Sequence, residues 1–288
     1  MDFDPLITFH QEHQADMTVA TMRVSREEAT RFGVLAADGD YRVSKFVEKP
    51  ADPPGTLISM GIYIFTMDAL DRALAEDACD PDSAHDFGKS IVPILLANGQ
   101  SIFGFPYSGY WVDVGTIDSY WQTHMDLLES PPAFNLNDRS WVIHTRSQER
   151  PPVLIHAGAI VGDSLVTDGS IIAEDARVVR SVLSPGVYVG PGAVVRESII
   201  LNNSYIEAGA QVYRTVMDKN TTIGHEAVVG EDTAASDLTM IGKNSQIPTR
   251  YKIGGSSVIH SDVVKADFPS SQIPAGTHVR RGYKNSTG

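Results

Sequence analysis

The sequence predicts an α/β region in the first half of the chain and a parallel β-helix in the second. The β-helix is indicated by an internal repeat of seventeen residues between Val153 and Gly230, and a fixed repeat of this length is typical of solenoids. Aliphatic residues recur at this period in two registers, Ile155, Ile172, Val189, Ile206 and Ile223, and Val161, Val178, Val195, Val212 and Val229. Alanine forms a third register from Ala159, and Ser or Thr a fourth from Ser164. Steps of five or six residues within a repeat predict hexapeptide units, three to a coil, and stacked coils bury a core that one coil cannot bury alone.

Composition excludes several classes of protein. The formal charge of −13 argues against a nucleic-acid partner, which needs clustered Lys and Arg. No apolar run approaches the length of a membrane span, and the N-terminus has no basic segment followed by an apolar stretch, so we expect neither membrane insertion nor a secretory signal. The single cysteine, Cys79, excludes an internal disulfide and fits a reducing, cytoplasmic location.

Strand and helix patterns alternate in the first half, which is typical of α/β proteins. The expected helices cover residues 2–15, 66–75, 91–97 and 116–128, and the expected strands 17–24, 59–65 and 101–105, with a hairpin at 32–47. Residues 59–65 are almost continuously apolar, which predicts burial on both faces of the sheet. Pro50 is expected to hold Lys49 in an extended conformation.

The pattern changes near Ser130. Residues 1–130 are therefore expected to form the α/β domain, 131–152 an interdomain connection and 153–288 the β-helix domain. Within the connection, Trp141, Val142 and Ile143 are apolar and are expected to be covered. Ile241, Ile247 and Ile253 stand six residues apart, so at least one further coil is expected after the regular repeat.

Five blocks in one order carry a resemblance to a known family. They read Phe-Val-Glu-Lys-Pro (46–50), Ser-Met-Gly-Ile-Tyr-Ile-Phe (59–65), His-Asp-Phe-Gly-Lys (85–89), Trp-Val-Asp-Val-Gly-Thr (111–116) and Asp-Arg-Ser-Trp (138–141), and the repeat follows them. Over nearly its whole length the chain resembles bacterial glucose-1-phosphate adenylyltransferases, nucleotidyltransferases that make ADP-glucose and pyrophosphate from ATP and glucose 1-phosphate for glycogen synthesis. The resemblance implies a left-handed β-helix, a homotetramer and a requirement for Mg²⁺.

The resemblance also implies roles for residues in these blocks. Lys49, a compact point charge, would bind the sugar phosphate and act in catalysis, and Glu48 would accept hydrogen bonds from sugar hydroxyls. Ser59 and Tyr63 would lie near the same pocket, although Tyr63 would serve equally well in the core. Asp86 and Phe87 would offer an acceptor and an apolar wall, or alternatively a helix cap and a core aromatic residue.

The Trp-Val-Asp block implies the metal site. Asp113 would be the catalytic Mg²⁺ ligand, because Mg²⁺ prefers one or two carboxylates together with phosphate and water. Trp111 would pack beside the sugar or Asp113, or serve only the structure. Val112 replaces the arginine that is usual in the family, so a nearby positive charge is lost.

The chain departs from the family pattern by lacking the Gly-Gly-x-Gly-x-Arg-Leu loop that cradles nucleotide phosphates and the Asp that would be the second metal ligand. We therefore expect it to correspond to the second half of the catalytic domain plus the β-helix, and to make little ADP-glucose alone. Detectable synthesis by the purified chain would contradict this expectation.

Two other functions stay open on the sequence. The chain would serve as a non-catalytic or regulatory subunit that assembles with a full-length homologue, whereas association only with copies of itself, the homo-oligomer that the resemblance implies, would count against this role. As a hexapeptide acyltransferase it would use a histidine between coils, such as His156, His225 or His260, but that function leaves the first 130 residues unexplained.

Overall fold

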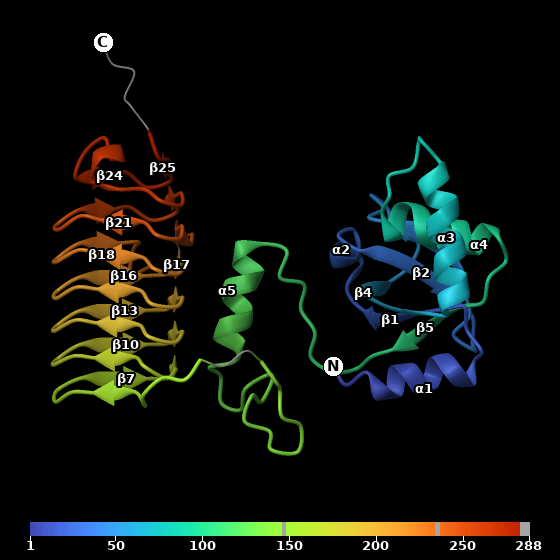
Figure 1. The fold of residues 1–288 in the computed structure, drawn as a ribbon, viewed down its shortest axis with the longest axis horizontal. Coiled ribbons are helices and arrows are strands. Elements are labelled where there is room, and N and C mark those ends of the chain that lie inside the picture. The colour runs from blue at the N-terminus through green and yellow to red at the C-terminus, as the bar shows by residue number, and fades with distance from the viewer. Residues whose placement is uncertain (146–147, 234–236, 283–288) are drawn as a thin grey trace, which may run out of the picture. The chain divides into compact units, whose positions relative to one another are not determined.

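The chain forms two compact units in the computed structural model, which describes residues 1–145, 148–233 and 237–282 (Figure 1). The α/β unit comprises Met1–Trp111 and the β-helix unit Val112–Gly288. The expected connection and β-helix domain also include residues 146–147, 234–236 and 283–288, which lie outside the described residues. The packing thus divides the chain at Trp111, while the boundary expected near residue 130 stays a prediction.

A mixed five-stranded sheet in the order β3-β2-β4-β1-β5 is the centre of the α/β unit. Its strands are β1 (Met17–Arg23), β2 (Gly33–Ala37), β3 (Val43–Glu48), β4 (Leu57–Phe65) and β5 (Ile102–Pro106). Strand β1 runs parallel to β5 and antiparallel to β4, and β2 and β3 form the predicted hairpin.

Helices cover both faces of this sheet, as Figure 1 shows. They are α1 (Asp4–Glu12), α2 (Arg26–Ala29), α3 (Met67–Cys79), the π-helix η1 (Phe87–Ile91) and α4 (Val92–Ala97). Helix α1 buries Leu6 in a cluster with Ala20 of β1, while Val19 of β1 belongs to the cluster formed with α3 and α4. Because alternate residues of a strand point to opposite faces, β1 is buried on both. The expectation of two buried faces holds for residues 58–60 of β4, which are all buried, but not from Gly61 on, where the strand is only partly buried or exposed.

The described part of the β-helix unit contains three parallel sheets of seven, seven and six short strands. The first holds β7 (Ile160–Gly162), β10 (Arg177–Val179), β13 (Val194–Arg196), β16 (Gln211–Tyr213), β19 (Val228–Val229), β22 (Lys252–Ile253) and β24 (Gln272–Ile273). The second holds β8 (Leu165–Val166), β11 (Val182–Leu183), β14 (Ile199–Ile200), β17 (Thr215–Met217), β20 (Thr239–Ile241), β23 (Val258–Ile259) and β25 (His278–Val279). The third holds β6 (Leu154–Ile155), β9 (Ile171–Ile172), β12 (Tyr188–Val189), β15 (Tyr205–Ile206), β18 (Thr222–Ile223) and β21 (Gln246–Ile247), and a 3₁₀ turn, η2 (Lys265–Asp267), precedes the last coil.

Hydrogen bonds and packing explain the four registers of the repeat. Val189 and Ile206 pair directly in neighbouring strands and are fully buried. The alanines of the third register are also fully buried, namely Ala176, Ala193, Ala210 and Ala227. The hydroxyl register links successive coils, since the Ser198 amide donates to Ser181 Oγ at 3.2 Å and the Thr215 amide donates to Ser198 Oγ at 3.1 Å. The predicted parallel β-helix is confirmed, including its extension beyond Met240.

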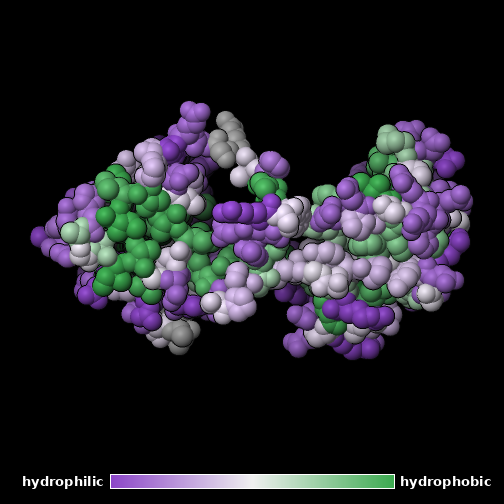
Figure 2. Space-filling model, turned by 90° about the horizontal axis from the view of Figure 1, so that it is seen from below, coloured by the Kyte–Doolittle hydropathy of each residue, from purple (hydrophilic) through white to green (hydrophobic). Residues whose placement is uncertain are grey.

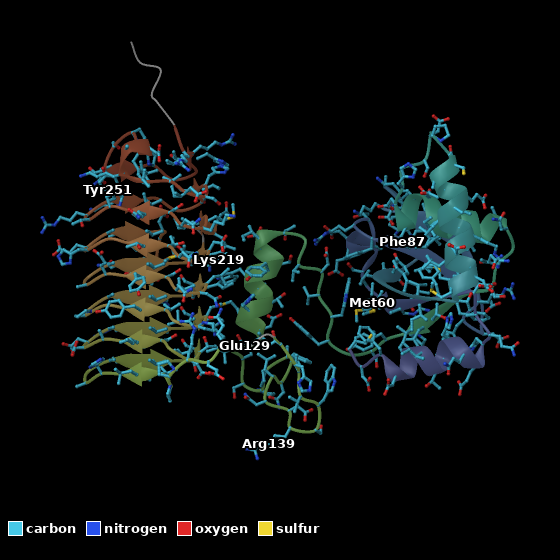
Figure 3. The ribbon with its side chains drawn as sticks, viewed as in Figure 1. Met60, Phe87, Glu129, Arg139, Lys219 and Tyr251 are labelled. Atoms are coloured by element: carbon cyan, nitrogen blue, oxygen red, sulfur yellow. The ribbon has the colours of Figure 1, made fainter. Side chains whose placement is uncertain are left out.

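Helix α5 (Ile117–Asp126) packs against the β-helix within the same unit. Met125 lies in one buried cluster with Ile199 and Val216 of the second sheet. The Trp121 indole N–H donates to the Glu197 carbonyl at 2.7 Å, and the Arg214 guanidinium lies 4.8 Å from the Trp121 ring centre. Just after the helix, Glu129, which is labelled in Figure 3, lies 3.2 Å from Arg180. The helix is therefore held by apolar, hydrogen-bonding and ionic contacts together.

Replacing Trp121 by Phe is expected to destabilise the β-helix unit by about 1 kcal/mol, because it keeps an aromatic ring under Arg214 but leaves the Glu197 carbonyl without its donor. Chemical denaturation followed by circular dichroism measures the change. Trp141→Phe is the matched control, since Trp141 is 39% exposed in a loop, and equal losses in the two variants would contradict this account.

Several apolar side chains of the β-helix unit remain exposed. Trp141, Val142 and Ile143 are exposed, so the expectation that they are covered is not met. Leu154, Ile155 and Ile160 of the first coil are each about half exposed, and Figure 2 shows an apolar area at this end of the β-helix. Across the part of the chain that the structure describes, no helix is long and apolar enough to cross a membrane.

Candidate functional site

Six of the predicted site residues gather in the α/β unit. Glu48 and Lys49 stand at the end of β3, Ser59 and Tyr63 lie on β4, and Asp86 and Phe87 begin the turn into η1. They come from three segments far apart in the sequence, so the fold and not the chain order brings them together.

A bulge in β4 places Ser59 and Tyr63. Thr21 pairs with Ser59 and Val19 with Tyr63, so β4 has two more residues than β1 over this stretch. Gly61, in the middle of the bulge, has a φ of +70°, a conformation that a residue without Cβ adopts without strain. The Gly61 amide donates to Ser59 Oγ at 3.1 Å, and this oxygen lies 3.3 Å from the Tyr63 hydroxyl. Bulges commonly re-aim side chains beside functional sites, and this one pairs two hydroxyl groups.

Gly88, the second residue of η1, allows this helix to approach Glu48 closely. A Cβ at residue 88 would lie 2.5 Å from Glu48 Oε2 and 3.4 Å from Asp86 Oδ1. The Glu48 and Asp86 carboxylates therefore flank the same buried glycine. Asp86 also caps η1 by accepting from the Lys89 amide at 2.9 Å, so the expected cap and the expected site residue are the same side chain. Gly88 was not among the predicted site residues. The feature of the sequence that pointed to it is its place in the His-Asp-Phe-Gly-Lys block.

Aromatic rings form a wall beside the two carboxylates. The Phe87 ring stacks on Tyr63 with ring centres 5.7 Å apart and an interplanar angle of 21°, yet Phe87 is 42% exposed. Burial raises the pKa of Tyr63, and the negative charges of Glu48 and Asp86 act in the same direction, while the Ser59 hydrogen bond opposes them. Tyr63 is thus a neutral hydroxyl that donates or accepts a hydrogen bond, and Phe87 is not a core residue.

Lys49 presents its charge to solvent next to Glu48. Its φ is +44°, so the expectation of an extended Lys49 is wrong. The Lys49 amide donates to the Phe32 carbonyl at 3.1 Å, which anchors the backbone to the hairpin just as the chain turns toward Pro50. The ammonium lies 3.8 Å from Glu48 Oε1 and its side chain is 64% exposed. This arrangement suits a polyhydroxylated ligand with an anionic group, because carboxylates accept from hydroxyls and an exposed ammonium binds the anion.

Comparisons with known proteins agree with these two units. Residues 1–130 match the family model described as nucleotidyl transferase, and residues 155–241 match the model described as GlmU-like, C-terminal hexapeptide. The glucose-1-phosphate adenylyltransferase of Geobacillus stearothermophilus is 42% identical over 64% of this chain and 47% of its own length. That of Thermotoga maritima is 43% identical over 97% of this chain and 68% of its own length, and the Thermotoga sp. strain RQ2 enzyme gives the same values. The chain belongs to the glucose-1-phosphate adenylyltransferase family.

The other two residues that the resemblance implies, Trp111 and Asp113, make none of the contacts described above. Trp111 packs in apolar clusters of the α/β unit, with its ring centre 5.7 Å from that of Phe32, which favours its structural role. Asp113 belongs to the β-helix unit, four residues before helix α5 begins. Its role therefore stays a prediction.

The described residues of the chain do not contain a complete metal site. Among residues 1–145, 148–233 and 237–282, no group of three or more His, Cys, Asp or Glu side chains is placed to hold a metal ion. Asp113 is a partly buried carboxylate beside Gly115. One such carboxylate fits Mg²⁺ when phosphate oxygens and water supply the remaining ligands.

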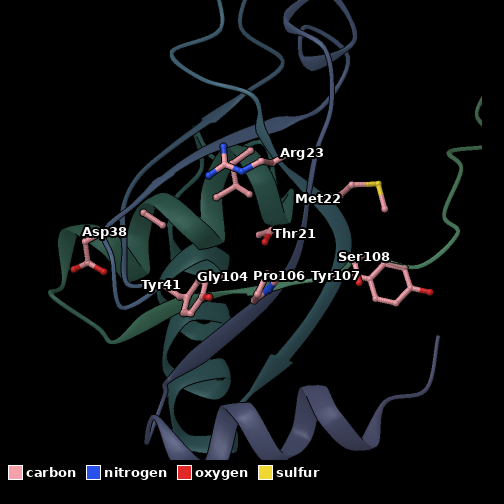
Figure 4. Close-up of a pocket in the computed structure, with 11 residues that line it drawn as sticks. Thr21, Met22, Arg23, Asp38, Tyr41, Gly104, Pro106, Tyr107 and Ser108 are labelled. Carbon is pink, nitrogen blue, oxygen red and sulfur yellow. The ribbon is translucent and has the colours of Figure 1, made fainter.

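A cavity of about 640 Å³ also opens in the α/β unit (Figure 4). It lies between the end of β1, the turn after β2 and the segment after β5, and none of the predicted site residues lines it. Its polar side chains include Arg23, Asp38 and Tyr41, and no sequence motif indicated this cavity. The histidines considered for acyl transfer lie in the β-helix unit, where His156 contacts Glu174 and His225 contacts Glu226.

Proposed function

We propose that this chain takes part in glucose-1-phosphate adenylyl transfer, the reaction that makes ADP-glucose and pyrophosphate from ATP and glucose 1-phosphate. The observation that carries the proposal is that Glu48 and Asp86 flank Gly88, while Phe87 stacks on Tyr63 and Lys49 lies beside Glu48. Two carboxylates and a phenol suit the hydroxyls of a hexose, and the ammonium suits its phosphate.

In this mechanism the chain's residues position the sugar phosphate. Glu48 and Asp86 accept hydrogen bonds from the hydroxyls, and the exposed face of Phe87 supports the sugar ring. Lys49 balances the charge of the phosphate, whose oxygen attacks the α-phosphorus of ATP as pyrophosphate leaves. Catalysis of this kind depends on positioning and charge neutralisation rather than on covalent intermediates. Asp113 would supply one carboxylate to Mg²⁺, which when bound neutralises charge on the phosphates.

Lys49→Ala is expected to weaken glucose 1-phosphate binding by about tenfold, because a charge-assisted bond to the phosphate is worth about 1.5 kcal/mol or more. Isothermal titration calorimetry with glucose 1-phosphate and with glucose measures the effect, and the loss should be confined to the phosphorylated sugar. Lys45→Ala is the matched control, since Lys45 is exposed on the same strand. If Lys49→Ala bound glucose 1-phosphate as tightly as the unchanged protein, the assignment of Lys49 would be wrong.

We also propose that the chain associates with further copies, as a homotetramer, or with a longer homologue as a non-catalytic subunit. The half-exposed apolar side chains of the first coil, Leu154, Ile155 and Ile160, support an association surface, since contiguous apolar patches often mark interaction sites. Light scattering of the purified chain distinguishes a monomer from an oligomer. Co-purification with a longer adenylyltransferase would favour the subunit role.

A further inference from the structure

Asp77 is a buried carboxylate that the proposed mechanism does not use. It lies in the last turn of helix α3 and is only 5% exposed. A negative charge is unfavourable at the C-terminal end of a helix, because the backbone carbonyls there already carry partial negative charge. Burial of the carboxylate adds a cost of desolvation. A carboxylate in this position therefore needs specific partners.

Both Asp77 oxygens have a partner from the loop that leads into η1. Ser83 donates its hydroxyl to Oδ1, and His85 Nδ1 lies 2.8 Å from Oδ2. Ser83 Oγ also accepts from the His85 amide at 3.0 Å and lies 2.9 Å from Ser90 Oγ inside η1. The Ser83 hydrogen bond, followed by that of His85, lowers the pKa of Asp77, so the carboxylate stays ionised at neutral pH.

These contacts determine the backbone immediately before the sugar-facing residues. His85 has a φ of +49°, an unfavourable conformation for a residue with a side chain, so neighbouring contacts must hold it there. The next residues are Asp86, whose carboxylate caps η1, and Phe87, which stacks on Tyr63. A change at His85 would therefore displace Asp86 and Phe87 relative to Glu48.

We propose that Asp77, Ser83 and His85 form a clasp that positions Asp86, Phe87 and Gly88 for the sugar ring of the bound ligand. This proposal rests on the proposed function, because Asp86 and Phe87, which the clasp positions, are the residues proposed to contact glucose 1-phosphate. The clasp residues are positioning residues: they act through the loop and do not touch the ligand.

The test compares His85→Ala and Ser83→Ala with Ser83→Thr, which keeps the hydroxyl, and with Asp82→Asn, an exposed acid in the same loop, as control. Calorimetry measures the affinity for glucose 1-phosphate and, separately, for inorganic phosphate. Loss of one positioning hydrogen bond worth about 1 kcal/mol should weaken glucose 1-phosphate binding roughly fivefold. Inorganic phosphate, which needs only Lys49, should bind unchanged. Ser83→Thr should regain most of the affinity.

Amide hydrogen exchange at Lys89 gives a second readout that does not depend on the ligand, since this amide is bonded to Asp86 Oδ1. His85→Ala should speed its exchange, while Asp82→Asn should not. If the unchanged protein fails to bind glucose 1-phosphate, the proposed function fails, and the exchange rate still decides whether the clasp holds the loop. Unchanged exchange in His85→Ala, or an equal loss of affinity for glucose 1-phosphate and inorganic phosphate, would overturn the clasp.

Discussion

Replacing Gly88 by Ala is expected to weaken glucose 1-phosphate binding by roughly a hundredfold, corresponding to about 2–3 kcal/mol of charge-assisted hydrogen bonding. The new Cβ would lie 2.5 Å from Glu48 Oε2 and 2.9 Å from its Cδ, so the carboxylate must move away. Glu48 would then no longer reach the sugar hydroxyls beside Asp86. Calorimetric titration with glucose 1-phosphate measures this loss.

Gly39→Ala is the matched control, because a Cβ at Gly39 meets nothing within 4 Å and its φ is not positive. This variant should keep the affinity of the unchanged protein. A Gly88→Ala variant that folds and binds with unchanged affinity would show that Glu48 does not contact the ligand. Circular dichroism of both variants separates a local displacement from loss of the fold.

Ile206→Ala is expected to lower the stability of the β-helix unit by about 2–5 kcal/mol, the usual loss for an aliphatic side chain removed from a packed core. Ile206 is fully buried and pairs with Val189 on one side and Ile223 on the other. The cavity would therefore interrupt a continuous stack of side chains. Each coil is stabilised through its neighbours, so the unfolding of the whole unit should shift and not that of one coil alone.

The control is Val264→Ala, which removes part of an aliphatic side chain that is 40% exposed in the same unit and lies outside the proposed association surface. Its effect should stay within about 0.5–1 kcal/mol, since exposed substitutions rarely cost more. Denaturant unfolding monitored by circular dichroism compares the two variants. Equal destabilisation would mean that the inward register of the repeat is misassigned.

The β-helix was predictable because its repeat translates directly into contacts between neighbouring coils. Ser181 and Ser198 stand seventeen residues apart and are hydrogen-bonded in space, so the period of the sequence is also the period of the structure. The α/β elements were found near their expected limits for a related reason, since alternation and helix-breaking residues act locally.

The site was only partly predictable, because it depends on contacts between distant segments. The motif blocks named Glu48, Asp86 and Phe87, but nothing in them indicated that Gly88 would be packed against Glu48, forty residues earlier in the chain. The bulge around Gly61 and the left-handed conformation of Lys49 depend on pairing with β1 and the hairpin. Asp77 lies outside all the motif blocks, and its partners Ser83 and His85 come from the loop that follows its helix.

Helix α5 has a consequence for exchanging parts between homologous adenylyltransferases. Its Trp121 and Met125 are fitted to Glu197, Arg214 and Ile199 of its own β-helix. In a chimera joined near residue 130, Trp121 and Met125 would pack against the β-helix of another homologue. The coils of this chain would in turn lose the helix that covers them. A junction at Trp111 would keep the helix with its coils, and Asp113 would then be inherited with the β-helix, separately from the residues that we propose to bind the sugar.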